Sequence, residues 1–410
     1  MTPNNVFLLI ISILIVHFLI GTLLDYLNAK NYQAPIPKGL EDVYPAEDYQ
    51  KSLAYKKTNY SFEIFSNTFS LIITLGFFLA NGFQWLHNYT ISITTHPIFS
   101  GLLFLGILMI GNDILSLPFS YYKNFVIEER FGFNKMTIST FILDKIKGWL
   151  MLIVIGGVLF ASIIWCFEQF GQNFWWYAWG ILSVFSIFLN MFYAKLIVPL
   201  FNKQSPLEQG SLRNQIESYG TKVGFDLKNI FVIDGSKRST KANAYFSGFG
   251  SEKRVTLFDT LINELSEDEI VAVFAHEVGH YKRKHIIFNL VFSLLSTGFT
   301  LWLFSVFVFN PLLSQALGVA EANFYIGLVS FGILYTPISE VVALIMNFIS
   351  RKFEYQADDY AKQTFAAEPL VSALKKLSKS SLSNLTPHPW YEFYHYSHPS
   401  LQKRITNLLK

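Results

Sequence analysis

The chain has 410 residues, of which 51% are hydrophobic and only 15% are charged, with a net charge of +3 and a mean hydropathy of +0.34. Soluble globular proteins carry about 25% charged residues, so the composition excludes an ordinary soluble domain and indicates an integral membrane protein. The net charge gives no sign of a nucleic-acid partner, and we expect none.

Apolar stretches of about 20 residues are typical of transmembrane helices, and the chain contains seven of them. In chain order they are Val6–Leu24, Ile64–Phe83, Ile98–Pro118, Trp149–Phe167, Phe174–Leu196, Ile286–Phe309 and Phe324–Ile349. The first stretch lacks a basic region before it and a small-residue cleavage site after it. We therefore expect a retained helix rather than a signal peptide.

The distribution of basic residues predicts the orientation of these helices. With seven spans, 31 of the 32 Lys and Arg residues fall on one side of the membrane, in segments 25–63, 119–148, 197–285 and 350–410. The segments on the other side carry none. The positive-inside rule then places the C-terminus in the cytosol and the N-terminus outside.

Two acidic residues, Asp113 and Glu340, lie within the apolar spans. Acids at membrane depth are costly and usually face a cavity or one another. Two interpretations stay open: they line a water-filled cavity, or they pair in the packing between helices.

The cytosolic segment after the fifth span predicts a small α+β element. Leu207–Val223 has the pattern of an amphipathic helix. Three strands are expected at Ile230–Asp234, Asn243–Ser247 and Arg254–Phe258, with a turn at Gly248–Lys253 between the last two.

A capping box begins the helix that follows. Ser266 and Glu269 can satisfy each other's free amides and start a helix over Glu267–Lys284. Ile270, Val271, Phe274 and Val278 give this helix a buried stripe.

The same helix carries the pentapeptide His-Glu-Val-Gly-His at residues 276–280. His276 and His280 lie one turn apart, so both imidazoles can bind one zinc ion. Glu277 then lies beside a metal-activated water, as in zinc peptidases. His285, five residues further, is expected to point away from the ligand face.

A catalytic zinc site needs a third protein ligand. Glu354 and Asp358, just after the seventh span, lie on one helical face. Glu354 can bind the metal while Asp358 accepts a hydrogen bond from a ligand imidazole. The alternative is a solvated acidic helix end, and spacing alone leaves both open.

HEVGH together with FEYQAD at residues 353–358 resembles the type I CAAX prenyl endopeptidase family of integral-membrane zinc metalloproteases. Other stretches are similar to that family's motifs: Leu117–Tyr122, Phe125–Lys135, Ser239–Gly248, Leu257–Thr260 and Ser397–Ser400 with Arg404. The resemblance implies an all-α polytopic membrane protein. Its seven helices would form a barrel around a water-filled chamber, with a small cytosolic α+β element carrying the zinc site.

The resemblance also implies hydrolysis of peptide bonds near the C-terminus of prenylated CAAX-like proteins, with membrane lipids and a peptide or protein substrate as partners. It assigns one Zn²⁺ to His276, His280 and Glu354 and the role of general base to Glu277. Asp358 would support a ligand without binding the metal. His398 and Arg404 would complete the catalytic site. Asn243 would lie at the substrate-binding edge.

The β propensity of Asn243–Ser247 adds a prediction about how substrate is held. We expect an edge strand facing the metal, to which the peptide adds as a further strand. Tyr245 or Phe246 would shape the pocket there. The alternative is that Asn243 only caps its own turn.

The chain divides into four expected regions. Helices one to five occupy residues 1–200, and the cytosolic α+β element with the zinc helix occupies 201–285. Helices six and seven occupy 286–349, and 350–410 form a cytosolic helical segment with the third ligand. The loops look shorter than those of eukaryotic family members, which favours a bacterial inner membrane; a eukaryotic member would lie in the endoplasmic reticulum membrane.

Two other functions stay in view. One is a quality-control zinc protease acting on unprenylated membrane proteins. The other is a non-catalytic chamber protein that binds lipid or peptide around a structural zinc. Glu277 disfavours the latter, because a structural site needs no base and normally closes with four protein ligands.

Overall fold

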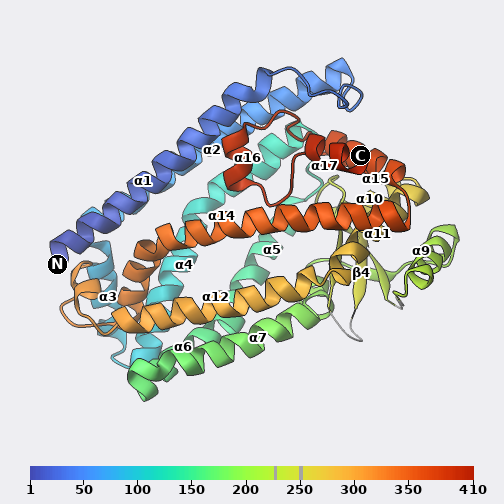
Figure 1. Cartoon of the computed structure of the whole chain (residues 1–410). Helices are drawn as coiled ribbons and strands as arrows, with labels where there is room; N and C mark the ends of the chain where they lie inside the picture. The colour runs from blue at the N-terminus through green and yellow to red at the C-terminus, as the bar shows by residue number, and fades with distance from the viewer. Residues whose placement is uncertain (226–228, 249–252) are drawn as a thin grey trace.

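The computed structural model describes residues 1–225, 229–248 and 253–410. Long helices dominate it, and a small sheet lies at one end (Figure 1). The helices of the membrane region are α1 (Pro3–Lys30), α2 (Ala46–Leu79), α3 (Gly82–Ile93), α4 (Pro97–Tyr122), α5 (Ile138–Met151), α6 (Gly157–Phe170), α7 (Phe174–Leu196), α12 (His285–Phe307), α13 (Leu312–Gln315) and α14 (Phe324–Thr364).

Six helical segments of the described chain are long and apolar enough to cross a membrane. One of them, Ile138–Phe201, is 64 residues long and contains the turn Gly171–Asn173, where α6 ends and α7 begins. A helix rises 1.5 Å per residue and about 20 residues cross the hydrocarbon core. This segment therefore supplies two crossings, which agrees with the seven expected.

The long helices surround a hollow interior. A compact protein of this mass exposes roughly 16,000 Å², whereas this one exposes 20,741 Å². One apolar core gathers around Phe104, Phe174 and Phe304 at the end of the bundle where α14 begins, and a second surrounds α11 at the other end. Between Phe331 and Glu354 no residue of α14 is buried. The expected chamber therefore lies between two packed ends.

The two acids in the spans have separate partners. Asp113 accepts bonds from Lys145 at 2.6 Å and from the indole of Trp149 at 2.8 Å. Glu340 accepts from the hydroxyl of Tyr394. Each acid keeps about a third of its side chain exposed. The two do not pair with each other, and their exposure agrees with the walls of a cavity.

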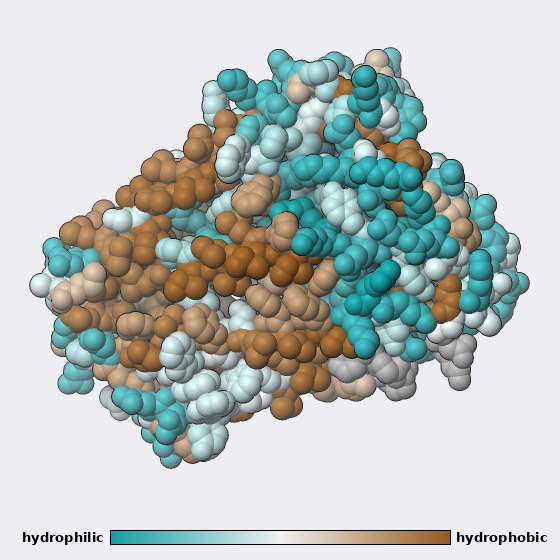
Figure 2. Space-filling view, in the orientation of Figure 1, coloured by the Kyte–Doolittle hydropathy of each residue, from teal (hydrophilic) through white to brown (hydrophobic). Residues whose placement is uncertain are grey.

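The end of the molecule opposite the N-terminus (Figure 1) contains the sheet and shorter helices: α8 (Val198–Phe201), α9 (Ser211–Lys222), α10 (Asp259–Glu264), α11 (Glu267–Lys282), α15 (Ala367–Ser380), α16 (Pro389–His395) and α17 (Leu401–Leu408). Figure 2 shows hydrophilic side chains gathered over this end and hydrophobic ones over the long helices. This division agrees with a membrane region that carries a cytosolic element.

The sheet has four strands in the order β1-β2-β4-β3. They are β1 (Gln204–Pro206), β2 (Ile230–Ile233), β3 (Ala244–Ser247) and β4 (Arg254–Phe258). Three of them were expected. β1 was missed because its residues, Gln-Ser-Pro, have no strand pattern and form a strand only through antiparallel pairing with β2. Residues 249–252 of the expected turn lie outside the described residues. Among the described residues β3 pairs only with β4, which leaves its other edge free.

Candidate zinc peptidase site

Helix α11 starts as its sequence predicts. The backbone amide of Ser266 donates to the carboxylate of Glu269 at 2.7 Å, and the Ser266 hydroxyl accepts from the Glu269 amide at 3.4 Å. Ile270, Val271, Phe274 and Val278 are all buried. The cap and the stripe fix the rotation of α11 and so the direction in which its histidines point.

The histidines of α11 meet the C-terminal part of α14. At 1.5 Å per residue the 41 residues of α14 span about 62 Å, roughly twice the hydrocarbon thickness. The helix therefore continues beyond the membrane and carries Glu354 and Asp358 to α11. Gly279 allows the close approach, because a Cβ on it would lie 3.0 Å from the Cα of Ala357.

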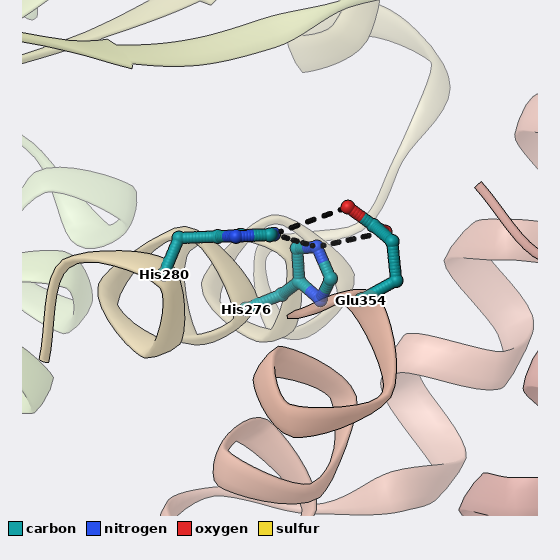
Figure 3. A group of neighbouring side chains, drawn as sticks. All are labelled: His276, His280 and Glu354. Carbon is teal, nitrogen blue, oxygen red and sulfur yellow. Dashed lines mark hydrogen bonds and ion pairs between the residues drawn. The ribbon is translucent and has the colours of Figure 1, made fainter. Parts of the chain in front are cut away.

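The three expected metal ligands converge (Figure 3). The Nε2 atoms of His276 and His280 are 3.1 Å apart, and Glu354 oxygens lie 3.6 Å from the first and 3.3 Å from the second. Donors bound to one tetrahedral zinc at 2.0–2.1 Å lie about 3.3 Å apart. Oε2 of Glu354 is buried and accepts no hydrogen bond from the described residues, although His276 and Arg404 lie 3.6 and 3.4 Å away. The donor set and this orphaned atom fit zinc.

Asp358 holds the far side of one ligand. Its Oδ1 lies 2.9 Å from Nδ1 of His276, which leaves Nε2 free to face the metal. Arg404 of α17 donates two hydrogen bonds to the same carboxylate, from Nε at 2.9 Å and from Nη2 at 2.6 Å. A bidentate pair of this kind is rigid as well as strong.

His285 lies against the other ligand, contrary to expectation. Its Nδ1 is 3.0 Å from Nδ1 of His280, and its Nε2 is 2.9 Å from the amide oxygen of Gln356. The cause is Lys284, whose φ of +61° breaks the helix and turns His285 back toward α14. Helical spacing could not reveal this contact, because the helix does not continue through it.

Electrostatics favour a charged carboxylate at the metal position. Burial alone would raise the pKa of Glu354, but the hydrogen bond from His280 and the charges of His276 and Arg404 lower it to about 2. Burial opposes a charge on His280, and the Glu354 and Glu277 carboxylates outweigh it and raise the imidazole pKa. A cation at this point would replace the proton on the imidazole.

The other expected site residues surround this centre. His398 Nε2 lies 3.3 Å from Glu354 Oε1 while 64% of the His398 side chain stays exposed. Glu277 is half-buried on α11. Arg404 also reaches Glu354, with Nη1 at 3.4 Å from Oε2, and is only 12% exposed.

The expected substrate strand is the free edge strand β3. Asn243, which precedes it, is exposed; its Oδ1 accepts the amide of Ala244 at 2.8 Å, and its Nδ2 has no hydrogen bond within the described part of the chain. Phe246 packs on Tyr281 of α11, and Tyr245 packs on Phe258. Both line a cavity of about 700 Å³ between β3 and α7.

Comparisons with known proteins agree with this arrangement. The profile for the CAAX prenyl protease N-terminal region with five membrane helices matches residues 25–203, and the profile for peptidase family M48 matches residues 206–410. The chain is 37% identical to CAAX prenyl protease 1 of Saccharomyces cerevisiae, over 94% of this chain and 91% of that one.

Two further comparisons cover nearly the whole chain. A CAAX prenyl protease 1 homolog of Oryza sativa is 36% identical over 97% of this chain and 96% of its own. The crystal structure of S. mikatae Ste24p matches with a TM-score of 0.93 and 37% identity, covering 98% of this chain and 99% of that one. These relatives are eukaryotic and of similar extent, so the comparison gives no support to shorter loops or a bacterial source.

Proposed function

We propose that this protein cleaves peptide bonds near the C-terminus of prenylated CAAX-like proteins. The premise is that the chain belongs to the CAAX prenyl protease 1 family of M48 peptidases. The protein is a multi-pass membrane zinc metalloendopeptidase. The observation that carries the proposal is the convergence of His276, His280 and Glu354 beside the free edge of the sheet.

Each side chain has a proposed task. Zinc held by the three ligands supplies Lewis-acid activation of water and of the scissile carbonyl. Glu277 takes a proton from the attacking water and passes it to the leaving amine. His398 is close to the ligands yet exposed, which suits a donor to the developing oxyanion.

Arg404 suits a different task from His398. Its Nε and both Nη groups face Asp358 and Glu354, and little of it is exposed. We assign it the positioning of these two carboxylates, whereas the resemblance implied only that it completes the catalytic site.

The substrate would add as a strand to β3. Main-chain hydrogen bonds along a free edge give affinity without requiring particular side chains. The unpaired amide of Asn243 would donate to the substrate backbone near the cut. The cavity beside Tyr245 and Phe246 is mainly apolar in its lining and would accept an apolar group of the substrate.

The active site is proposed to face the cytosol. The zinc helix lies at the end of the molecule that carries segments 197–285 and 350–410, both rich in Lys and Arg. The positive-inside rule places such segments in the cytosol.

The experiment is hydrolysis of matched peptides, one prenylated on the CAAX cysteine and one plain, followed by mass spectrometry of the products. We expect cleavage near the C-terminus, faster for the prenylated peptide, and abolished by 1,10-phenanthroline. Glu277→Ala should retain zinc and lose turnover, because the residue is a base and not a ligand. Equal cleavage of both peptides would favour the quality-control protease, and full turnover in Glu277→Ala would refute the mechanism.

A further inference from the structure

A second cavity, which β3 does not line, lies near the zinc site. It has a volume of about 630 Å³, within the range of roughly 300–1,000 Å³ found for ligand pockets. His398 and Arg404 line it, and both lie within 3.4 Å of Glu354. Two residues of the cavity wall therefore contact a proposed metal ligand.

The cavity wall contains a buried cation without an acidic partner. Lys56 of α2 is 7% exposed, and its Nζ has no hydrogen-bond partner among the described residues. The rings of Tyr32 and Tyr49 lie 5.9 Å from the ammonium, at the outer limit of a cation–π contact. Burial of an ammonium costs several kcal/mol unless a counter-charge compensates, so this group needs an explanation.

The other charges of the cavity are matched. Lys123 pairs with Glu63 at 3.5 Å, and Arg404 pairs with Asp358. Lys56 is held in place from one turn earlier, where the hydroxyl of Ser52 donates to the carbonyl of Leu382 at 3.3 Å. Lys56 is thus fixed in the wall of a polar cavity, with its Nζ covered by neighbouring atoms.

We propose that this cavity receives the C-terminal residues of the substrate and that Lys56 binds their free α-carboxylate. The inference rests on the proposed function, which places the cut near the C-terminus. The apolar cavity beside β3 then holds the other side of the scissile bond. The charge at Lys56 sets the direction in which the peptide crosses the zinc site.

The test compares one peptide with a free C-terminal carboxylate and the same peptide with a C-terminal carboxamide. A hydrogen bond to a charged group contributes about 1.5–3 kcal/mol, so kcat/KM of the wild type should favour the acid by roughly 10-fold or more. Lys56→Met should lower turnover of the acid to that of the amide and leave the amide unchanged. Lys56→Arg should retain a preference for the acid.

Lys57→Met is the matched control, because Lys57 is exposed and does not line this cavity. It should keep the wild-type preference. Turnover of the amide reports on folding, since a misfolded variant loses both activities. Equal cleavage of acid and amide by the wild type, or an unchanged preference in Lys56→Met, would overturn the inference. Cleavage of neither peptide by the wild type would instead count against the proposed function.

Discussion

At the scale of single residues, the site depends on how each ligand is held from behind. His276 contacts Asp358 at 2.9 Å, and His280 contacts His285 at 3.0 Å. If each ligand binds zinc through Nε2, its Nδ1 carries a proton and must donate it. Asp358 and Nδ1 of His285 are the acceptors at those positions. Both ligands are therefore oriented before the metal binds.

We predict different effects for the two acids of α14. Glu354→Ala should lower zinc occupancy, because it removes one of three ligands. Asp358→Ala should retain zinc with affinity reduced about 10- to 100-fold, as is typical when the partner of a ligand is lost. The zinc content of each purified variant measures occupancy, and competition with a chelator measures affinity. Stoichiometric zinc of unchanged affinity in Glu354→Ala would remove Glu354 from the ligand set.

His285 should matter for the metal although it does not bind it. His285→Phe keeps the ring that stacks on Phe353 at 3.9 Å but cannot accept from His280. We expect zinc affinity to fall by about 10-fold or more with a small change in melting temperature. His96→Phe, at the start of α4, is the control. An unchanged chelator titration would make the contact irrelevant to metal binding.

At the scale of elements, the approach of α11 to α14 assembles the site. A Cβ on Gly279 would lie 3.0 and 3.1 Å from backbone atoms of Ala357, so a side chain there would require a small shift. The glycine of HEVGH therefore serves the packing of two helices that supply all three ligands.

Gly279→Ala should separate these helices. Overpacking costs about 1–3 kcal/mol. This cost matches or exceeds the roughly 1 kcal/mol by which alanine favours a helix over glycine. We expect a lower melting temperature and weaker zinc binding. Gly76→Ala in α2, where nothing lies within 4 Å, is the control and should not weaken zinc binding. A variant with normal zinc affinity would show that the ligands do not require this spacing.

The free edge of β3 gives a second prediction at this scale. Asn243→Ala should lower kcat/KM and leave zinc content and melting temperature nearly unchanged, as expected for a lost contact to the transition state. Asn214→Ala, on the exposed face of α9, should have no effect. A large loss of stability with normal specific activity would mean that Asn243 only caps its own turn.

At the scale of the whole molecule, the hollow between two packed ends separates the zinc site from the opposite side of the membrane. Asp113 with Lys145 and Glu340 with Tyr394 place polar groups within the membrane-spanning helices. We expect these groups to line the chamber, through which a substrate would reach the zinc site in water.

Orientation can be tested with single cysteines. The one native cysteine, Cys166, is buried and can be replaced by alanine. In sealed vesicles of known orientation, Glu321→Cys should react with an impermeant reagent from the non-cytosolic side and Glu208→Cys from the cytosolic side. Both positions are exposed. The reverse pattern would place the zinc site outside the cytosol and contradict the CAAX proposal.

The sequence by itself determined the features that depend on local or compositional physics. Apolar length fixed the seven crossings, since every buried backbone group in lipid must bond within its own helix. The capping box and the 3.6-residue period fixed α11 and the shared face of His276 and His280.

Only the tertiary structure decided which distant residues meet. Glu354 lies 74 residues after His280, and no local pattern shows that Gly279 lets their helices touch. His285 returns to His280 through one left-handed residue, Lys284, that breaks the helical period. Lys56 looks like any surface lysine in the sequence. Its burial follows from α2 packing on the loop after α15, because burial is a property of the assembled fold and not of the segment.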